Sequence, residues 1–293
     1  IFEETVFDYD TLKQRLRETA FLTKGLRIVL TDLRENPART HDFHYAGGVK
    51  QVMKQLAGKI HTDAPTIYGD TTWGELLDSV KSAPNKVIHS LEDPVAKEPG
   101  LKIMRGNISP AGAIVRPTAV YEEVKYIKGA AKVYECDQDA YRAIMAGEIV
   151  AGDILVIRYE GCKGAPGMKE LMLSIDALIG LGLDKKVGLI TDARFSGFNY
   201  GAIVGHVSPE AYDGGVIALI ENGDEIEMDI AGGTVNLLVS DEILAERRKS
   251  WVRPPLKQQK GVLNIYAQNC RPAEEGGAMQ PWALDADYGY HHE

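Results

Sequence analysis

Cysteine, histidine and long apolar runs are scarce in this chain. Its 3 cysteines, Cys136, Cys162 and Cys270, lie far apart and form no CxxC pair. Such spacing builds no disulfide framework, zinc site or iron–sulfur site, so we expect free thiols in a reducing cytoplasm. No apolar stretch has membrane-spanning length and no signal-peptide pattern opens the chain, so we expect a cytoplasmic protein without membrane contacts.

Positive charge is in short supply as well. Over 293 residues the formal net charge is −9, which argues against nucleic acid as a partner. The 7 histidines form no zinc motif: His41 and His44 have no carboxylate pattern beside them, and His206 follows an apolar strand. An apolar fraction of 44% and a charged fraction of 26% are typical of a globular protein. A length of 293 residues predicts about two domains.

The N-terminal region carries mostly helical patterns. Apolar spacing predicts a helix over residues 8–22, capped by Asp10, then a strand at 27–30 and a loop at 32–42. Further predicted elements are a helix opening at 46–48, a short strand at 66–68, and a helix from Thr72 to about Val80 with Glu75 completing a capping box. Residues 90–100, charged and Pro-bearing, predict a linker.

Short strands dominate after this linker, and the pattern predicts a β-rich α/β domain, a small barrel or sandwich with helices outside. The predicted strands are 101–104, 112–115, 131–134, 153–157, 187–190, 201–205, 215–220, 225–230 and 234–239. The predicted helices are 139–145 with Asp137 as cap, one starting near Gly167, and one capped by Ser240 and ending near Trp251. The tail from Arg253 is rich in Pro, Gln and Gly and is expected to cover a surface.

Polar, glycine-rich loops follow the strands at 153–157 and 187–190, with one helix between them. This βαβ pattern places both loops outside the carboxyl ends of parallel strands, where open α/β sheets usually bind ligands. Glu160, Glu170 and Asp192 are acidic candidates there, and carboxylates at a loop–helix junction suit Mg²⁺. A first-turn glutamate also has a purely structural explanation, because the helix dipole favours it.

Ser196 lies in the second of these loops, between Phe195 and Gly197. An exposed serine can act as a nucleophile or base if its pKa is lowered, although a simple Ser-Gly turn explains the spacing equally. The hydrolase elbow requires glycine two residues before and after the serine. Arg194 and Phe198 occupy those positions, and no His–Asp partner is evident, so a serine hydrolase is the weakest alternative.

Long ordered motifs make the chain recognisable. They are residues 105–110 (RGNISP), 159–170 (YEGCKGAPGMKE), 189–197 (LITDARFSG), 205–211 (GHVSPEA), 217–224 (IALIENGD) and 239–242 (VSDE). Together they closely resemble the dihydroxy-acid dehydratase and sugar-acid (6-phosphogluconate) dehydratase family. The resemblance covers essentially the whole chain but only the C-terminal half of a typical family member.

The resemblance implies a hydro-lyase that removes water from a 2,3-dihydroxy carboxylic acid and yields a 2-keto acid. In the family an iron–sulfur cluster acts on the leaving C3 hydroxyl, Mg²⁺ holds the carboxylate and the C2 hydroxyl, and a deprotonated serine takes the C2 proton. Ser196 matches that serine, and Glu170 matches the Mg²⁺-binding glutamate. Arg194 and the backbone of Ser196 and Gly197 are expected to contact the substrate carboxylate. A nearby cation would stabilise the serine alkoxide.

The resemblance also implies a domain arrangement and partners. Residues 1–95 would be the C-terminal part of an α/β cluster domain, 96–252 an aconitase-like swivelling β/β/α barrel domain, and 253–293 a C-terminal tail. The cluster cysteines and the other Mg²⁺ ligands belong to the family's N-terminal half, which this sequence does not contain. We therefore expect that half as a partner, together with assembly as a homodimer or higher oligomer. Whether the cluster is [2Fe–2S] or [4Fe–4S] stays open.

Departures from the family pattern bear on the substrate. Cys162 stands where proline is usual, and Ala193 replaces a usual glycine. Residues 42–48 look more like the sugar-acid members, so an aldonic acid is the expected substrate. The alternatives are a branched-chain dihydroxy-acid dehydratase of valine and isoleucine synthesis, and a non-catalytic module that keeps the fold without the cluster half.

Overall fold

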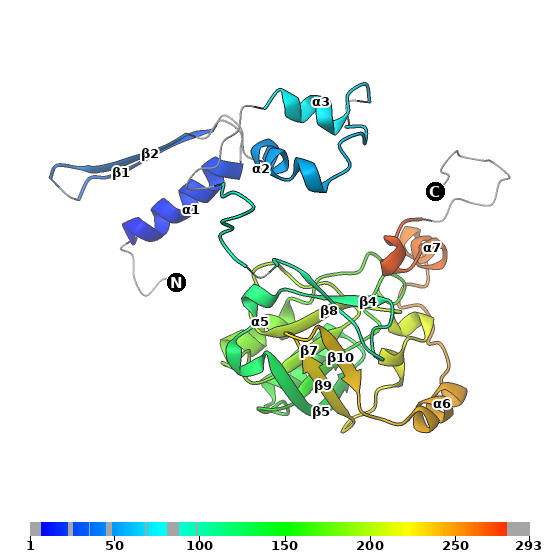
Figure 1. The fold of residues 1–293 in the computed structure, drawn as a ribbon. Coiled ribbons are helices and arrows are strands. Elements are labelled where there is room, and N and C mark those ends of the chain that lie inside the picture. Colours follow the sequence, from blue (N-terminus) through cyan, green and yellow to red (C-terminus); the bar gives the residue numbers. More distant parts are fainter. Residues whose placement is uncertain are drawn as a thin grey trace. The chain divides into compact units, whose positions relative to one another are not determined.

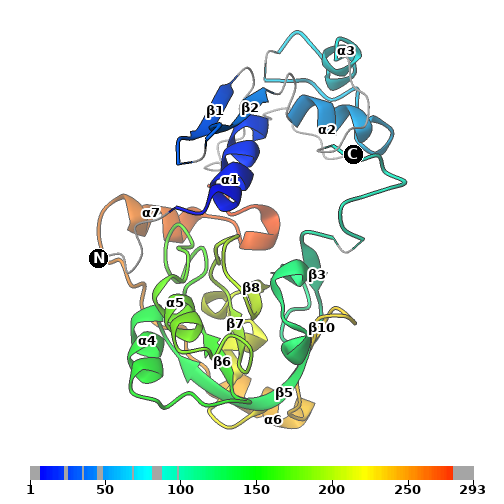
Figure 2. The ribbon, with the colours of Figure 1, turned by 90° about the vertical axis from the view of Figure 1, so that its left-hand side faces the viewer.

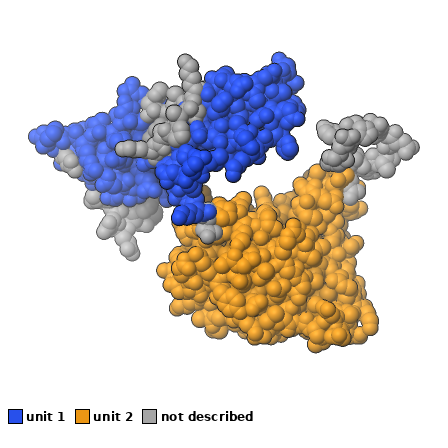
Figure 3. All heavy atoms as spheres, in the orientation of Figure 1, with its two compact units in different colours: residues 1–97 blue, residues 98–293 orange. Residues whose placement is uncertain are grey.

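The computed structural model describes residues 7–22, 26–34, 36–44, 49–67, 69–80, 88–97 and 99–279, and all structural statements below concern these residues. The chain divides into two compact units, residues 1–97 and 98–293 (Figure 3). The division falls inside the predicted linker, where prolines and charges leave little apolar surface to bury.

The first unit is small and mostly helical. Its elements are α1 (Tyr9–Leu22), β1 (Arg27–Asp32), β2 (Arg39–His44), α2 (Val49–Gln55) and α3 (Trp73–Asp78). Strands β1 and β2 pair antiparallel, and α1 packs on both. The capping box of α3 is confirmed, since Thr72 Oγ1 accepts from the N–H of Glu75 and the Glu75 carboxylate accepts from the N–H of Thr72.

Three predictions for this unit were wrong. The loop predicted at 32–42 becomes strand β2 from Arg39, because its polar side chains are carried on an exposed two-stranded ribbon. Asp8 rather than Asp10 caps α1, since Asp8 Oδ1 accepts from the N–H of Thr11 at 2.7 Å. Thr66 and Ile67 form no strand, while Tyr68 and the predicted helix start at 46–48 lie outside the described residues.

The second unit is built on an eight-stranded sheet with the order β10-β9-β5-β6-β7-β8-β4-β3 (Figure 1). The strands are β3 (Lys102–Met104), β4 (Gly112–Val115), β5 (Tyr126–Tyr134), β6 (Ile154–Ile157), β7 (Gly188–Thr191), β8 (Ala202–Ser208), β9 (Glu225–Asp229) and β10 (Thr234–Leu237). The central run β5-β6-β7-β8 is parallel, and the strands on both sides of it pair antiparallel. The predicted βαβ unit is therefore present, with β6 and β7 as neighbours.

The two edges of this sheet meet, so it is nearly closed. Arg105, directly after β3, pairs with Thr234 of β10: its N–H donates to Gly233 O at 2.9 Å, and its carbonyl accepts from Val235 N at 2.8 Å. The approach requires glycine at the next position, since a Cβ on Gly106, whose φ is +148°, would stand 2.0 Å from Val235 O. Closure removes the exposed edges that an open sheet would present.

Alternating side chains of β6 divide the unit into two cores. Ile154 and Val156 join the core enclosed by the sheet, whereas Leu155 and Ile157 face a second core. Helices α4 (Asp137–Met145) and α5 (Leu173–Gly180) cover that second core and pack on each other (Figure 2). Two further helices complete the unit, α6 (Asp241–Ser250), capped by Ser240 as predicted, and α7 (Val262–Asn269) in the segment predicted to be tail.

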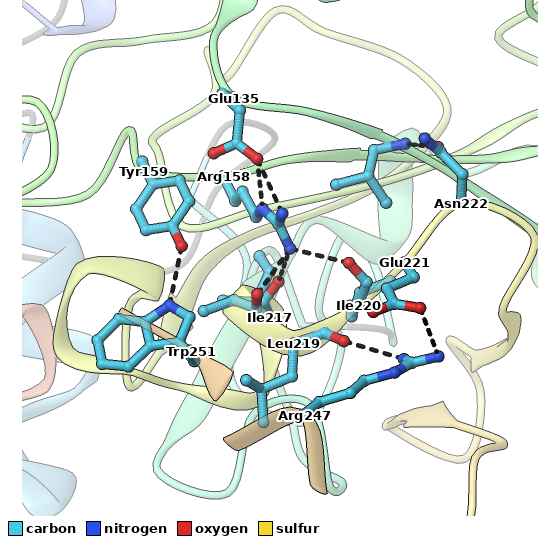
Figure 4. A network of polar contacts seen from close by, with 12 residues as sticks. Glu135, Arg158, Tyr159, Ile217, Leu219, Ile220, Glu221, Asn222, Arg247 and Trp251 are labelled. Carbon is cyan, nitrogen blue, oxygen red and sulfur yellow. Dashed lines mark hydrogen bonds and ion pairs between the residues drawn. The ribbon is translucent and has the colours of Figure 1, made fainter. Parts of the chain in front are cut away.

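Residues 215–220, predicted to be a strand, instead contain a 3₁₀ helix, η5 (Val216–Leu219). Its carbonyls are satisfied by arginine rather than by a neighbouring strand (Figure 4). Arg158 Nη1 donates to Ile217 O, Ala218 O and Ile220 O at 3.2, 2.8 and 2.8 Å, and Arg247 Nη1 donates to Leu219 O at 3.0 Å. An apolar run alone does not distinguish a buried strand from a buried turn of helix.

The helix predicted to start near Gly167 begins later, at Leu173. Gly167 and Met168 have φ values of +91° and +50°, which no α-helix accommodates. The start of α5 is capped from outside: the Asp137 carboxylate accepts from Ser174 N at 3.1 Å and from Ser174 Oγ at 2.6 Å. Asp137, predicted to cap its own helix, is thus the first residue of α4 and stabilises the neighbouring helix instead.

A candidate active site beyond strands β6 and β7

Glu170 lies in an extended segment, not in a helix. It forms a parallel bridge with Arg194: Arg194 N donates to Lys169 O at 3.2 Å, and Leu171 N donates to Arg194 O at 2.9 Å. The Arg194 side chain reinforces this pairing by donating from Nε to Met168 O. The loop after β6 and the loop after β7 are therefore fastened together, and Glu170 is exposed opposite a residue two positions before Ser196.

Ser196 sits in a tight, half-buried turn closed by Asn199. Asn199 Oδ1 accepts from Ser196 N at 2.8 Å, and Asn199 N donates to Ser196 O at 3.2 Å. Phe198 N donates to Ser196 Oγ at 3.2 Å, so a backbone dipole already points at the serine oxygen. A donor placed there favours the oxygen that carries negative charge. The same N–H contact occurs in ordinary serine turns, so a catalytic role of Ser196 stays a prediction.

Two buried carboxylates accept hydrogen bonds from the backbone of the loop after β6. Asp192 accepts from Tyr159 N, Glu160 N and Ala211 N at 3.1, 2.9 and 3.0 Å. Glu210 Oε1 accepts from Lys163 N and Gly164 N at 3.0 and 2.9 Å. Burial raises the pKa of Asp192 to about 6 and the pKa of Glu210 to about 7, and the mutual repulsion of the carboxylates adds to the effect.

Glu160, an acidic candidate from the sequence, is buried at 1% exposure and serves the scaffold of this loop. Its Oε1 receives Lys169 Nζ at 3.3 Å and Lys257 Nζ at 3.2 Å, while Oε2 accepts no hydrogen bond from the described residues. Lys257 comes from the predicted tail, so that segment is tied to the site loop. Asp192 thus positions the loop through its N–H groups, while Glu160 pairs with Lys169 of the loop and with Lys257.

The structure gathers the predicted site residues Glu170, Arg194, Ser196 and Gly197 on two paired segments. Arg194 and Gly197 are exposed. Their roles in catalysis, substrate binding and metal binding stay predictions. His206 lies behind the site: its ring meets Phe195 edge-on at 6.4 Å, and burial together with Arg194 lowers the pKa of His206.

Sequence reasoning missed residues that this geometry identifies. Asn199 closes the serine turn, Glu210 holds the glycine loop, and Arg116 lies beside Gly197. No local pattern marks Arg116 or Glu210, because each reaches the site from a distant segment. Asn199 could have been predicted from the sequence, because an Asn three residues after a serine is a common turn signal.

The described residues include no group of three or more His, Cys, Asp or Glu side chains that could hold a metal ion. Glu170 fits the part of one carboxylate ligand, because it is exposed and its carboxylate takes part in no side-chain hydrogen bond with any residue that the structure describes. The cysteines do not fit an iron–sulfur cluster. Cys162 and Cys270 are buried together with Met168, and burial raises the pKa of the Cys162 thiol to about 11, whereas cluster ligands are thiolates.

Comparison with known proteins identifies the family of the chain. A family model described as dihydroxy-acid/6-phosphogluconate dehydratase C-terminal matches residues 86–277. The chain belongs to this dehydratase family, as its C-terminal part. No helix within the described residues combines the length and apolar character needed to cross a membrane.

Curated relatives carry the name dihydroxy-acid dehydratase. One from Geobacter sp. (strain M21) is 47% identical over 244 residues, covering 82% of this chain and 44% of the relative. One from Caldanaerobacter subterraneus subsp. tengcongensis is 45% identical over 241 residues, covering 82% and 43%. One from Synechocystis sp. is 43% identical over 265 residues, covering 89% and 45%. The chain thus spans less than half the length of these relatives.

Proposed function

We propose that the chain is the C-terminal part of a hydro-lyase that removes water from a 2,3-dihydroxy carboxylic acid. The observation that supports the proposal is the backbone pairing of Glu170 with Arg194, which joins the segment that carries an exposed carboxylate to the loop that carries Ser196. Abstraction of a proton next to a carboxylate needs a base and a cation that stabilises the developing negative charge; Ser196 would be the base, and Glu170 would be one ligand of the cation. The iron–sulfur cluster and the remaining Mg²⁺ ligands would come from an N-terminal region such as the relatives possess.

In this proposal Ser196 takes the proton from C2 of the substrate. The N–H of Phe198 would stabilise negative charge on Ser196 Oγ, and the hydrogen bond from Ser196 N to Asn199 Oδ1 would hold the turn. Mg²⁺, when bound, would supply a positive charge that lowers the pKa of the serine hydroxyl, with Glu170 as one ligand. Arg194 and the backbone at Gly197 would contact the substrate carboxylate. Cytoplasmic location and assembly as a homodimer or higher oligomer stay proposals.

The aldonic acid expected from residues 42–48 receives no support from the relatives, which are named dihydroxy-acid dehydratases. We therefore propose a branched-chain dihydroxy acid, of the kind used in valine and isoleucine synthesis, as the preferred substrate. The discriminating assay measures 2-keto acid formed from a branched-chain dihydroxy acid and from an aldonic acid at equal concentration. Faster turnover of the aldonic acid would reverse the preference.

The decisive test uses the chain assembled with the N-terminal region of a relative, with cluster and Mg²⁺ reconstituted. Ser196→Ala is expected to lower kcat by ~10²- to 10⁴-fold, the usual contribution of a positioned base. Ser250→Ala, a hydroxyl at the end of α6 that bonds only Arg247 O, is the matched control and should keep its activity. Full activity of Ser196→Ala would exclude Ser196 as the base. A chain inactive in every assembly would favour the non-catalytic alternative.

A further inference from the structure

Arg116 is a second cation at the serine turn. It follows directly after β4 and is half-buried. Its Nη1 lies 3.9 Å from the point where a Cβ on Gly197 would stand, and it is the only heavy atom within 4 Å of that point outside the neighbouring residues. The backbone fixes this proximity, because Gly201 N donates to Ala119 O at 3.0 Å and so holds the two segments together.

The guanidinium of Arg116 is not used by the fold. Within the described residues it donates no hydrogen bond and forms no ion pair, and its aromatic neighbour is the Tyr200 ring, 5.8 Å from Arg116 Cζ to the ring centroid. Two other partly buried arginines differ, since Arg158 and Arg247 each bind backbone carbonyls and a carboxylate. A partly desolvated guanidinium without a partner favours an anion that enters its surroundings.

We propose that Arg116 binds the carboxylate of the substrate next to Ser196. The inference rests on the proposed dehydratase function and deepens it by naming a second guanidinium, in addition to that of Arg194, that recognises the acid group. A guanidinium offers two parallel N–H donors that match a carboxylate, which a lysine cannot reproduce. Gly197 is compatible with this role, since even a Cβ there would stand only in van der Waals contact with Arg116 Nη1.

The experiment uses the assembled, reconstituted enzyme and compares wild type, Arg116→Ala, Arg116→Lys and Arg142→Ala. Arg142 is the matched control, because its exposed side chain pairs only with Asp139 on the same helix. Arg116→Ala should raise KM by roughly 10- to 100-fold, the effect of losing a hydrogen-bonded charge, with a smaller change in kcat. Arg116→Lys should fall between, and added guanidinium chloride should restore part of the activity of Arg116→Ala.

The outcomes separate this inference from the function beneath it. Wild-type enzyme inactive on every dihydroxy acid would overturn the proposed function itself. Active wild type with Arg116→Ala matching Arg142→Ala in KM would overturn the role of Arg116 alone. If Arg116→Ala does not fold, Arg116→Lys decides: a KM equal to wild type contradicts bidentate carboxylate binding, and a raised KM with an unchanged unfolding midpoint supports it.

Discussion

Glu160, Asp192 and Glu210 show that an acidic side chain beside a site need not act on a substrate. All three are buried. Asp192 and Glu210 accept backbone N–H groups of the loop that leads to Glu170, whereas Glu160 accepts the N–H of Asp137 at the start of α4. The close approach depends on Gly161, because a Cβ there would stand 2.5 Å from Glu210 Oε2. Sequence patterns identified the acidic strand ends, but only burial distinguishes these supporting carboxylates from the exposed Glu170.

The raised pKa of Glu210 predicts a pH dependence of stability. Its pKa is about 7 in the folded chain against an ordinary value of 4.5, so between these values the folded state binds more protons than the unfolded state. The stabilisation is complete below about 4.5 and is lost as the pH rises to about 7. Glu210→Gln keeps an acceptor for the loop without the charge, so relative to wild type it should gain on the order of 2 kcal/mol from pH 5 to pH 8.

The measurement is urea unfolding of both proteins across this pH range. Glu122→Gln is the matched control, because the Glu122 side chain is 83% exposed and pairs with Lys125 on the surface. The difference between Glu122→Gln and wild type should stay nearly constant with pH. A constant difference for Glu210→Gln as well would show that Glu210 ionises normally in the folded chain.

At the scale of elements, local sequence signals predicted a helix correctly where neighbouring residues determine its start. The capping box at Thr72 and the cap at Ser240 were correct because each needs only a few neighbouring residues. The helix from Gly167 and the strand at 215–220 were wrong because distant groups decide them: Arg194 pairs with the first, and Arg158 binds the carbonyls of the second. Such partners cannot be read from a local window.

Arg158→Met tests how far η5 depends on its arginine. The Arg158 side chain is 15% exposed, and Met keeps its apolar stem while leaving three carbonyls without their donor. We expect a loss of ~2–4 kcal/mol in the free energy of unfolding, because buried acceptors left unpaired are costly. Arg142→Met, on a side chain 74% exposed, should change it by less than about 0.5 kcal/mol. Equal effects in urea unfolding would mean that other contacts hold η5.

At the scale of the molecule, the division into two units was readable from the sequence, whereas the closing of the sheet was not. The linker is marked by composition, and composition is local. Closure depends on the pairing of Arg105 with Thr234, which lie far apart in the sequence. Gly106, which allows the two strands to approach closely, is the local sign of this pairing in the sequence. The order of strands likewise depends on long-range pairing, such as β5 between β6 and β9. The resemblance to a family therefore predicted more of the fold than hydrophobic periodicity did, because a family's motifs imply its long-range strand pairings as well.

The two units predict different folding behaviour. Residues 98–293 contain both large cores, and every residue of these cores comes from within that unit. We therefore expect residues 98–293 to unfold cooperatively when expressed alone, with a calorimetric midpoint within a few degrees of the same transition in the whole chain, since ~1 kcal/mol corresponds to about 2–4 °C at this size. Residues 1–97 bury few large apolar side chains among the described positions and should melt at lower temperature.

A midpoint for residues 98–293 that falls by 10 °C or more, roughly 3 kcal/mol, would show that the barrel unit draws stability from the first unit. An unchanged midpoint would mean that the fold around Ser196 and Glu170 is complete in itself, so that any dependence of activity on further segments arises from the cofactors and ligands those segments supply.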